Sequence, residues 1–475
     1  MKIAELWREY HEATKHSVES LQRSPHFLDW ENMPHPFRHY EGVPVLDLPA
    51  DPPNLVDGAA FLSQLLFYSA AISASKRVPS TGFRYALRVN PSSGNLHPTE
   101  FHFITRGLKD WPDGLYHYRP SSHMAEQRAV GDFTTELAGI DAPVVFVLTS
   151  IAWREAWKYR DRGYRYCLHD MGHAWQSLAM AARSLGCESF AKGTFSDDEV
   201  ARVCRLNEDE WPMLLVGLRG EAILVCKPDA GETVWFGGAA NRLSSETIDY
   251  LLIRRIHAAT KLGCGGECEP AASGSGEIKL PEPAVWTRPY GEVARTRRSA
   301  LDFAGGTRSM SLAQLSAILG ATAEPFFADF AAARFVQLYL YVHRVDGLEP
   351  GVYRHWAERG ELERLKTGDQ RVVAAGLSLR QELAGNACVT FSMIADLERA
   401  TRAYGDRGYR YAHFEAGAIG QRMYIAAEGL ELQATGIGAF FDDQVHRYLG
   451  LTPDQRQVIY HFAIGHAVRD PRLEG

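Results

Sequence analysis

The chain has 475 residues, 45% of which are hydrophobic, and a formal net charge of −7. This charge argues against a general binder of nucleic acid. The length predicts two or three domains, and each half is long enough to build its own core.

Targeting signals are not predicted at the N-terminus or within the chain. Residues 1–21 predict a charged amphipathic helix and lack the apolar stretch of a secretory signal. No apolar run reaches about 18 residues, so no membrane span is expected. The seven cysteines lie mostly in apolar segments, which is typical of reduced thiols. We therefore expect a cytoplasmic protein.

Residues 91–98 read PSSGNLHP and predict a ligand-binding loop. They are small, polar and turn-forming, and they lead into a strand-like segment that begins at Thr99. Gly94 permits close approach of a ligand to the backbone, while the serine and asparagine side chains offer short hydrogen-bonding groups. The alternative is an ordinary surface turn.

A long internal repeat follows this loop. Residues 159–202 recur as residues 404–447, aligned without a gap at an offset of 245 (404 − 159). Each copy is preceded by an apolar run of the buried-strand type and continues from RGYRY into a helix that is apolar on much of its circumference. We expect each helix to be buried against its duplicate.

The repeat divides the chain into two domains of the α+β class, because strands and long helices are mixed in each half. Residues 263–284 are rich in Gly, Ser and Pro and predict a linker between domains at 1–262 and 285–475. Cys264 and Cys268 lie in this linker. A structural zinc site needs about four ligands and no second pair is near, so two free thiols are favoured over a metal or redox role.

The two halves have kept different functional segments. The second half opens with Arg295, Arg297, Arg298 and Ser299, whose forked donors and hydroxyl suit a phosphate. The corresponding part of the first half has no arginine, and the loop at 91–98 corresponds to the bulky, apolar segment 324–335. A site at an interface, made of parts from both halves, explains this complementary loss. Taken singly, the arginines could be a solvated basic surface.

These stretches together resemble the flavin-dependent nitroreductase superfamily, in particular its SagB/ThcOx-type (azoline) dehydrogenase branch. LRVNPSSGNLHPTEFHF is similar to the loop and strand of that branch, KYRDRGYRYCLHDMGHAWQSL to its central segment, and RRS to the FMN phosphate motif. The resemblance implies two tandem nitroreductase-like α/β sandwich domains that dock through long helices as an intramolecular pseudo-dimer. FMN would lie at their interface.

The resemblance also implies roles for individual residues. Thr435, Gly436 and Ile437 would place a backbone N–H beside the flavin ring and stabilise its reduced form. Lys158 and Tyr159 would be catalytic and assist proton abstraction, provided that the pKa of the lysine is lowered; a surface lysine beside a core tyrosine is the alternative. The phosphate-binding residues would be Arg297, Arg298 and Ser299, with Arg469 as a further candidate, and the flavin loop would be Pro91, Ser92, Ser93, Gly94 and Asn95.

Two other features favour structural roles. Tyr164, Arg165 and Tyr166 recur in both halves, including the half with no predicted site, which indicates scaffold. His173 is replaced by Ala418 in the second copy, so it either lines the site or is a hydrogen-bonded core histidine.

The resulting hypothesis is an FMN-dependent oxidoreductase with one composite site per chain. Its substrate would be an azoline-bearing or other modified peptide, or a small metabolite, with oxygen or another acceptor. One alternative is an NAD(P)H-dependent nitro or quinone reductase. Another is a catalytically degenerate flavin-binding or partner-binding protein. No metal, nucleic acid or membrane partner is expected; the chain would be a monomeric pseudo-dimer, with further self-association left open.

Overall fold

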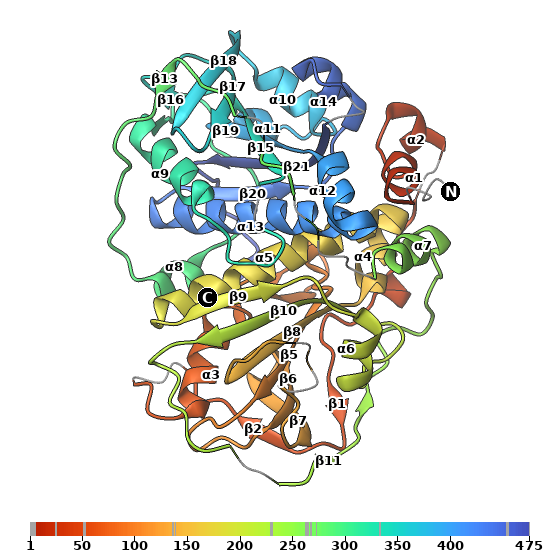
Figure 1. Ribbon diagram of the computed structural model, residues 1–475. Coiled ribbons are helices and arrows are strands. Elements are labelled where there is room, and N and C mark those ends of the chain that lie inside the picture. Colours follow the sequence, from red (N-terminus) through yellow and green to blue (C-terminus); the bar gives the residue numbers. More distant parts are fainter. Residues whose placement is uncertain are drawn as a thin grey trace.

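Two sheets, one from each half of the chain, sandwich a pair of long crossing helices (Figure 1). The computed structural model describes residues 6–23, 26–50, 54–134, 137, 139–228, 231–261, 266, 268–271, 273–331, 334–452 and 456–474. This arrangement confirms the predicted α+β architecture with tandem halves.

The sheet of the first half is antiparallel and has the strand order β11-β7-β6-β5-β8-β10-β9, with β2 paired to β7. Its central strand β8 contains the sequence VVFVLTS, and every residue of that strand is buried. A strand covered on both faces is expected to be apolar throughout. The strands are β2 (Val45–Asp47), β5 (Thr99–Thr105), β6 (Gly114–Arg119), β7 (Met124–Val130), β8 (Val144–Ser150), β9 (Glu188–Lys192), β10 (Trp211–Arg219) and β11 (Val234–Trp235).

The sheet of the second half repeats this topology with the order β13-β18-β17-β15-β19-β21-β20. Its strand β19 has the sequence VTFSMIA and is also buried along its whole length, as the repeat predicted. The strands are β13 (Ile278–Lys279), β15 (Val336–Val342), β17 (Gly351–Trp356), β18 (Glu361–Thr367), β19 (Val389–Ala395), β20 (Gln433–Ile437) and β21 (Gln457–Gly465).

The central helices α5 (Gly163–Ser184) and α13 (Gly408–Gly429) pack directly on each other. They cross at two glycines that are equivalent in the repeat. A Cβ atom on Gly172 would collide with the carbonyl of Phe414, and one on Gly417 would collide with the carbonyl of His169. The crossing therefore has the self-complementary symmetry of a homodimer interface, and the prediction that the two helices are buried against each other is confirmed.

Buried ion pairs connect the halves at both ends of this helix pair. Arg165 contacts Asp442 at 3.0 Å, and its repeat equivalent Arg410 contacts Asp197 at 2.7 Å. Each aspartate belongs to the opposite half, at the start of α6 (Asp197–Val203) or α14 (Asp442–Leu449). The recurring RGYRY segments are therefore scaffold, as predicted, since their arginines hold the halves together.

The structural repeat begins earlier than the predicted linker. The hydroxyl of Thr14, just after α1 (Leu6–Ala13), accepts a bond from an α5 arginine at 3.0 Å. The hydroxyl of Thr260, just after α7 (Leu251–Ala259), accepts the equivalent bond from α13 at 2.8 Å. Helix α7 therefore repeats α1, although it lies inside the predicted first domain.

Part of the predicted linker is also an element of the second half. Within residues 263–284, β13 pairs with β18 as β2 pairs with β7. Cys264 lies outside the described residues, and Cys268 is a free, half-buried thiol whose Sγ lies 3.7 Å from Nη1 of Arg399. In the described part of the chain, no group of three or more His, Cys, Asp or Glu side chains is arranged to hold a metal ion.

Several of the remaining helices pack on the central helix pair, and the remaining strands form small separate sheets. The C-terminal strand β22 pairs with β3, and therefore brings the end of the second half onto the first. These elements are the strands β1 (Tyr40–Glu41), β3 (Ile72–Arg77), β4 (Arg84–Arg88), β12 (Ala239–Ala240), β14 (Met310–Ser311), β16 (Val345–Asp346) and β22 (Leu473–Glu474), and the helices α2 (Val18–Arg23), α3 (Gly58–Phe67), α4 (Ala152–Tyr159), α8 (Tyr290–Thr296), α9 (Leu312–Ala323), α10 (Arg371–Leu377), α11 (Leu383–Asn386) and α12 (Leu397–Tyr404).

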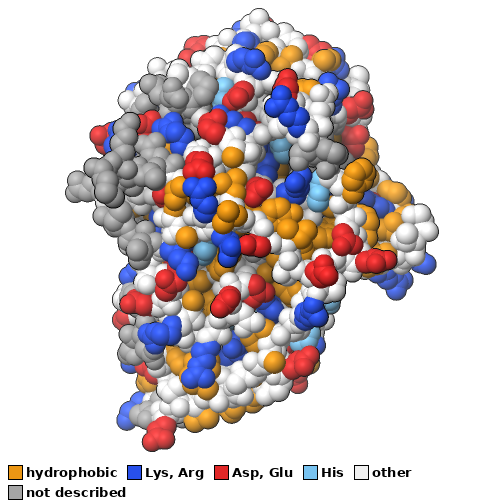
Figure 2. Space-filling model, turned by 90° about the vertical axis from the view of Figure 1, so that its right-hand side faces the viewer, with side chains coloured by type: hydrophobic (Ala, Val, Ile, Leu, Met, Phe, Trp, Pro, Cys, Tyr) orange, Lys and Arg blue, Asp and Glu red, His pale blue; other side chains and the backbone are white. Residues whose placement is uncertain are grey.

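The surface carries no extended field of one charge on the face drawn in Figure 2, where basic and acidic side chains alternate around apolar patches. No described helix is long and apolar enough to cross a membrane.

Candidate active site

The loop at residues 91–95 follows β4 and folds into a single 3-10 turn over Ser93–Asn95. Gly94 has φ of +59°, and Asn95 has φ of +60°. Glycine adopts this left-handed conformation without a steric penalty, and asparagine tolerates it better than most residues. The residue types that predicted a binding loop therefore also determine its shape.

A carboxylate of the central helix anchors this loop. Asp170 on α5 accepts hydrogen bonds from Ser92 Oγ at 2.6 Å, from Ser93 N at 3.0 Å and from Ser93 Oγ at 2.9 Å. Burial raises the pKa of Asp170 to about 7, although the serine donors oppose that shift. Asp170 was not among the predicted site residues. The repeat contains a signal that could have identified it, because the position equivalent to 170 is also acidic, Glu415. Glu415 accepts hydrogen bonds from the backbone N–H groups of Phe335 and Val336, at the start of β15.

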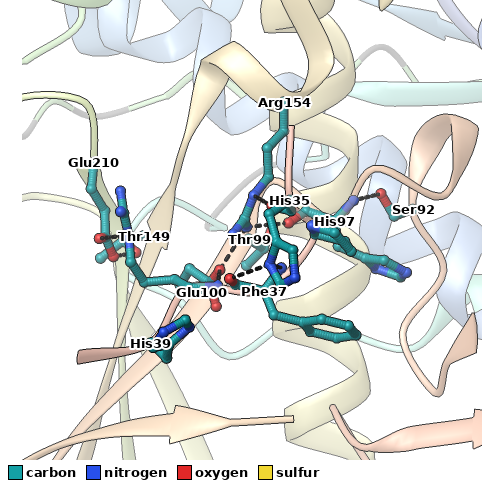
Figure 3. Close-up of polar contacts among 12 residues, drawn as sticks. His35, Phe37, His39, Ser92, His97, Thr99, Glu100, Thr149, Arg154 and Glu210 are labelled. Atoms are coloured by element: carbon teal, nitrogen blue, oxygen red, sulfur yellow. Dashed lines mark hydrogen bonds and ion pairs between the residues drawn. The ribbon is translucent and has the colours of Figure 1, made fainter. Parts of the chain in front are cut away.

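A second polar network supports the other side of the loop (Figure 3). Arg154 on α4 donates from Nη1 to the carbonyl of His97 at 2.6 Å and to Glu100 Oε1 at 2.6 Å. The backbone N–H of His97 in turn donates to Ser92 Oγ at 2.8 Å. Burial opposes the charge of Glu100, but Arg154 and His117 hold the pKa of that carboxyl at about 2. The loop is thus held from both α4 and α5.

Lys158 and Tyr159, at the end of α4, lie directly against Gly94. A Cβ atom at position 94 would be 2.7 Å from Tyr159 Oη and 3.2 Å from Lys158 Nζ. The Tyr159 ring packs edge-on against Tyr166, with ring centroids 4.6 Å apart. Burial raises the pKa of Tyr159 well above 10, with the Glu155 carboxyl adding to the shift. The predicted proximity of this pair to the loop is confirmed, whereas its catalytic role stays a prediction.

Glu155 forms a buried carboxyl pair with Asp170. Both side chains are almost fully buried, and the Glu155 oxygens have no hydrogen-bond donor among the described residues. Burial raises the pKa of Glu155 well above its usual range, and the neighbouring Asp170 charge raises it further. Two adjacent carboxyls in such a place cannot both be ionised, so the pair retains at least one proton at neutral pH.

The arginine motif of the second half meets the loop of the first. Arg297 is 3% exposed, and it donates from Nε to the carbonyl of Val89 at 3.1 Å and from Nη2 to the carbonyl of Arg88 at 3.2 Å. These carbonyls lie just before Pro91. The predicted meeting of two segments about 200 residues apart is therefore confirmed.

The other predicted phosphate ligands line one cavity of about 820 Å³. Arg298, Ser299 and Arg469 contribute to its wall, and so does Lys76 of the first half, which also pairs with Asp470 at 2.9 Å. We call it the cationic cavity and define it by Lys76, Arg298, Ser299, Arg308, His466 and Arg469. Lys76 and Arg308 were not predicted, because only the tertiary fold brings them to this wall.

Thr435, Gly436 and Ile437 lie in β20, at the edge of the second sheet. The N–H of Gly436 donates to Tyr424 Oη at 3.0 Å, and this hydroxyl also lies 2.8 Å from Ser299 Oγ. A Cβ atom on Gly436 would overlap the hydroxyl of Tyr460. The N–H of Gly436 is therefore a backbone donor next to the arginine motif, and it is bonded to a tyrosine hydroxyl, whereas Ala434 in the same strand already bonds to the backbone of Ala300.

His173 is a hydrogen-bonded core histidine beside this region. Its ring nitrogens lie 3.2 Å from Tyr460 Oη and 3.3 Å from Gln421 Oε1. Burial lowers its pKa to about 3, so it is neutral at physiological pH.

The structure therefore defines the chain as a duplicated α+β protein whose halves dock as a pseudo-dimer, with a cationic cavity that residues of both halves line. Comparison with known proteins assigns the family: the nitroreductase family model matches residues 69–220 and 294–466, more than half of the chain. The chain belongs to the nitroreductase family, whose members are oxidoreductases that generally bind FMN.

Individual relatives agree with this assignment. MJ1384 of Methanocaldococcus jannaschii, provisionally named a nitroreductase, is 33% identical over 183 residues, which are 36% of this chain and 89% of that protein. The microcin B17-processing protein McbC of Escherichia coli is 28% identical over 147 residues, which are 28% of this chain and 54% of McbC. The crystal structure of a protein from Anabaena variabilis, also provisionally named a nitroreductase, has a TM-score of 0.82 at 26% identity and covers 98% of this chain and 100% of that chain.

Proposed function

We propose that the chain is an FMN-dependent oxidoreductase with one flavin site, built from both halves. The observation that carries this proposal is the contact of Arg297 with the carbonyls of Arg88 and Val89. It joins the anion-binding motif of one half to the glycine-containing loop of the other. Family membership supports FMN as the cofactor.

The side chains present fit this cofactor. Arg297 Nη1 and Asn90 Oδ1 are buried, and neither has a hydrogen-bond partner among the described residues. A buried polar atom without a partner is costly unless a ligand completes its hydrogen bonds. Arg298, Ser299 and Arg469 would hold the phosphate, while the loop at 91–95 and the Gly436 N–H would face the flavin ring. Bound FMN supplies a two-electron redox centre at this position.

The chain itself provides a place for the proton that leaves the substrate. Because burial keeps Tyr159 protonated at neutral pH, Tyr159 would orient the substrate as a hydrogen-bond donor, and Lys158 in its uncharged form would accept the proton. The Glu155–Asp170 pair lies behind them. The positions equivalent to Glu155 and Lys158 in the second half, 400 and 403, are both alanine. The carboxyl and the amine therefore occur only in the half that carries the loop at 91–95.

For the substrate, we favour an azoline-bearing or other modified peptide, or a smaller metabolite, with oxygen or another acceptor. The similarity to McbC supports a peptide, although the chain spans about half the length of that protein. We propose that the chain acts without a nucleic acid or membrane partner, as a monomeric pseudo-dimer.

FMN titration of the flavin-free protein tests the composite site. We expect about one FMN per chain and a loss of affinity of roughly tenfold or more in Arg297→Ala, because a hydrogen bond to a charged group contributes about 1.5–3 kcal/mol. Arg219→Ala is the matched control, since Arg219 lies in the other half and pairs with Asp141. Two FMN per chain, or equal affinities for the two variants, would contradict the proposal.

The similarity to MJ1384 supports one alternative, in which electrons flow from NAD(P)H to the flavin and then to a nitro compound or a quinone. An NAD(P)H-dependent nitro or quinone reductase would lose its oxidised-flavin absorption in a single hydride transfer when NADH or NADPH is added without oxygen or another acceptor. We expect the flavin to stay oxidised under these conditions. Rapid bleaching would favour the reductase.

A further inference from the structure

A second cavity of about 1210 Å³ lies between the halves, apart from the cationic cavity. Both halves contribute to it: Trp175, Gln176 and Phe190 come from the first, and Trp286, Tyr290 and Phe327 from the second. We call it the aromatic cavity and define it by these six residues.

The internal repeat relates the two cavities. Arg183 and Cys187 line the aromatic cavity, and their equivalents 245 residues later, Glu428 and Leu432, line the space of the cationic cavity. In a symmetric dimer these would be two copies of one site. The aromatic cavity is therefore the second copy, and its lining shows what it has become.

The second copy has lost the features suited to FMN. Ala191, the equivalent of Gly436, donates its N–H to the carbonyl of Phe327 at 2.9 Å, and its own carbonyl accepts from Asp329 N at 3.1 Å. Asp329 also accepts from Gly193 N at 2.7 Å. The segment that replaced the serine loop thus pairs along the sheet edge and closes it with backbone bonds. The N–H of Ala191 is therefore held by a main-chain carbonyl, whereas the equivalent N–H of Gly436 is held by a tyrosine hydroxyl that can rotate away from a ligand.

The cations around the aromatic cavity are already engaged. Arg183 pairs with Glu324 at 2.7 Å, and Arg219 pairs with Asp141 at 3.5 Å. Arg422 donates to main-chain carbonyls of the neighbouring segment. The lining of the aromatic cavity also includes the acidic side chains of Asp141, Glu188 and Glu324, which balance these three arginines, so a neutral ligand is favoured over a phosphate.

The space itself suits a flat, apolar molecule with one polar edge. Phe327 is 70% exposed and Phe190 is 48% exposed, which is unusual for phenylalanine and leaves aromatic faces open to a ligand. Gln176 is only 6% exposed and lines the cavity, and it has no hydrogen-bond partner among the described residues. Its amide offers one acceptor and two donors at a fixed spacing.

A small residue on α5 leaves room for this cavity, because the equivalent position on α13 holds a tyrosine. Position 179 on α5 is alanine, and the equivalent position 424 on α13 is the tyrosine whose hydroxyl covers Gly436. We propose that the aromatic cavity is a binding site for a neutral, planar aromatic molecule whose amide-like or imide-like edge hydrogen-bonds to Gln176. This site is distinct from the flavin site and does not depend on it.

Calorimetric titration with 1,8-naphthalimide, a neutral aromatic imide, tests the proposal on the full-length protein saturated with FMN. We expect about one equivalent to bind. In Ala179→Tyr, which places the residue of the other repeat in the cavity, affinity should fall at least roughly tenfold. Ala258→Tyr on the exposed face of α7 is the matched control and should bind as the unmodified protein does.

Three outcomes would overturn the proposal. These outcomes are no binding of the imide, equal binding to Ala179→Tyr, and release of FMN in step with imide binding. Failure of FMN itself to bind would refute the proposed function but not this site, because the Ala179→Tyr comparison still reports on the aromatic cavity. Circular dichroism of both variants checks that they fold.

Discussion

Replacement of Gly94 by alanine combines two effects, backbone strain and steric overlap. The first is backbone strain, because φ of +59° costs an alanine about 1–2 kcal/mol. The second is overlap: the new Cβ would lie 2.7 Å from Tyr159 Oη and 3.2 Å from Lys158 Nζ. Tyr159 cannot move freely, because its ring packs on Tyr166 at 4.6 Å. Overpacking of this kind costs about 1–3 kcal/mol.

Gly360→Ala is the matched control for the first effect alone. Gly360 has φ of +62°, and nothing lies within 4 Å of the Cβ that it would gain. We expect Gly360→Ala to lower the free energy of unfolding by about 1–2 kcal/mol. Gly94→Ala should lose about 1–3 kcal/mol more, and FMN should bind roughly tenfold or more weakly to it.

Urea unfolding and flavin fluorescence measure these two quantities. If the two variants lose the same stability and bind FMN equally well, then Gly94 does not hold Lys158 and Tyr159 against the loop. The assignment of these residues to one site would then be wrong.

Two further predictions concern buried carboxylates. Asp197→Asn and Asp442→Asn should each lower the free energy of unfolding by about 3–5 kcal/mol and by similar amounts. Each removes the carboxylate that pairs with two buried arginines, Arg407 and Arg410 or their repeat equivalents Arg162 and Arg165. Urea unfolding that shows almost no loss in either variant would refute the scaffold role. Burial raises the pKa of Asp170 to about 7 in the folded chain, whereas an unfolded aspartate has a pKa of about 3.9. Between these values the folded chain binds more protons, so this group's contribution to stability is lost as pH rises from about 4 to 7. Asp170→Asn should remove that part of the pH dependence in urea unfolding measured at several pH values, and an unchanged profile would contradict it.

The repeat explains how much of the fold could be predicted. Residues 159–202 and 404–447 match over helix-forming and strand-forming segments, and apolar periodicity is a local property of the chain. The buried helices, the buried strands and the arginine scaffold therefore followed from the amino-acid pattern. The start of the second half was missed because its signal is short: HEATK at residues 11–15 recurs as HAATK at residues 257–261. The structure shows that Thr14 and Thr260 in these segments bond equivalent arginines.

The site residues also fall into those that the sequence predicted and those that only the structure identified. The residue types at Gly94, Ser93 and Arg297 indicated a loop and an anion clamp, and their unequal loss from the two halves indicated that they belong together. Only the tertiary structure placed Lys76 in the cationic cavity and Asp170 behind the loop, since each contact joins segments far apart in the chain.

By itself, the amino-acid sequence determined that the protein is a duplication with complementary parts, because composition and spacing are written along one chain. The tertiary structure decided which parts meet. The crossing of α5 and α13 at Gly172 and Gly417 sets the orientation of the halves, and that orientation places Arg297 on the carbonyl of Val89. At one repeat site this orientation leaves the N–H of Gly436 bonded to a tyrosine hydroxyl, and at the other the equivalent N–H of Ala191 bonds to the carbonyl of Phe327, which no local pattern could show.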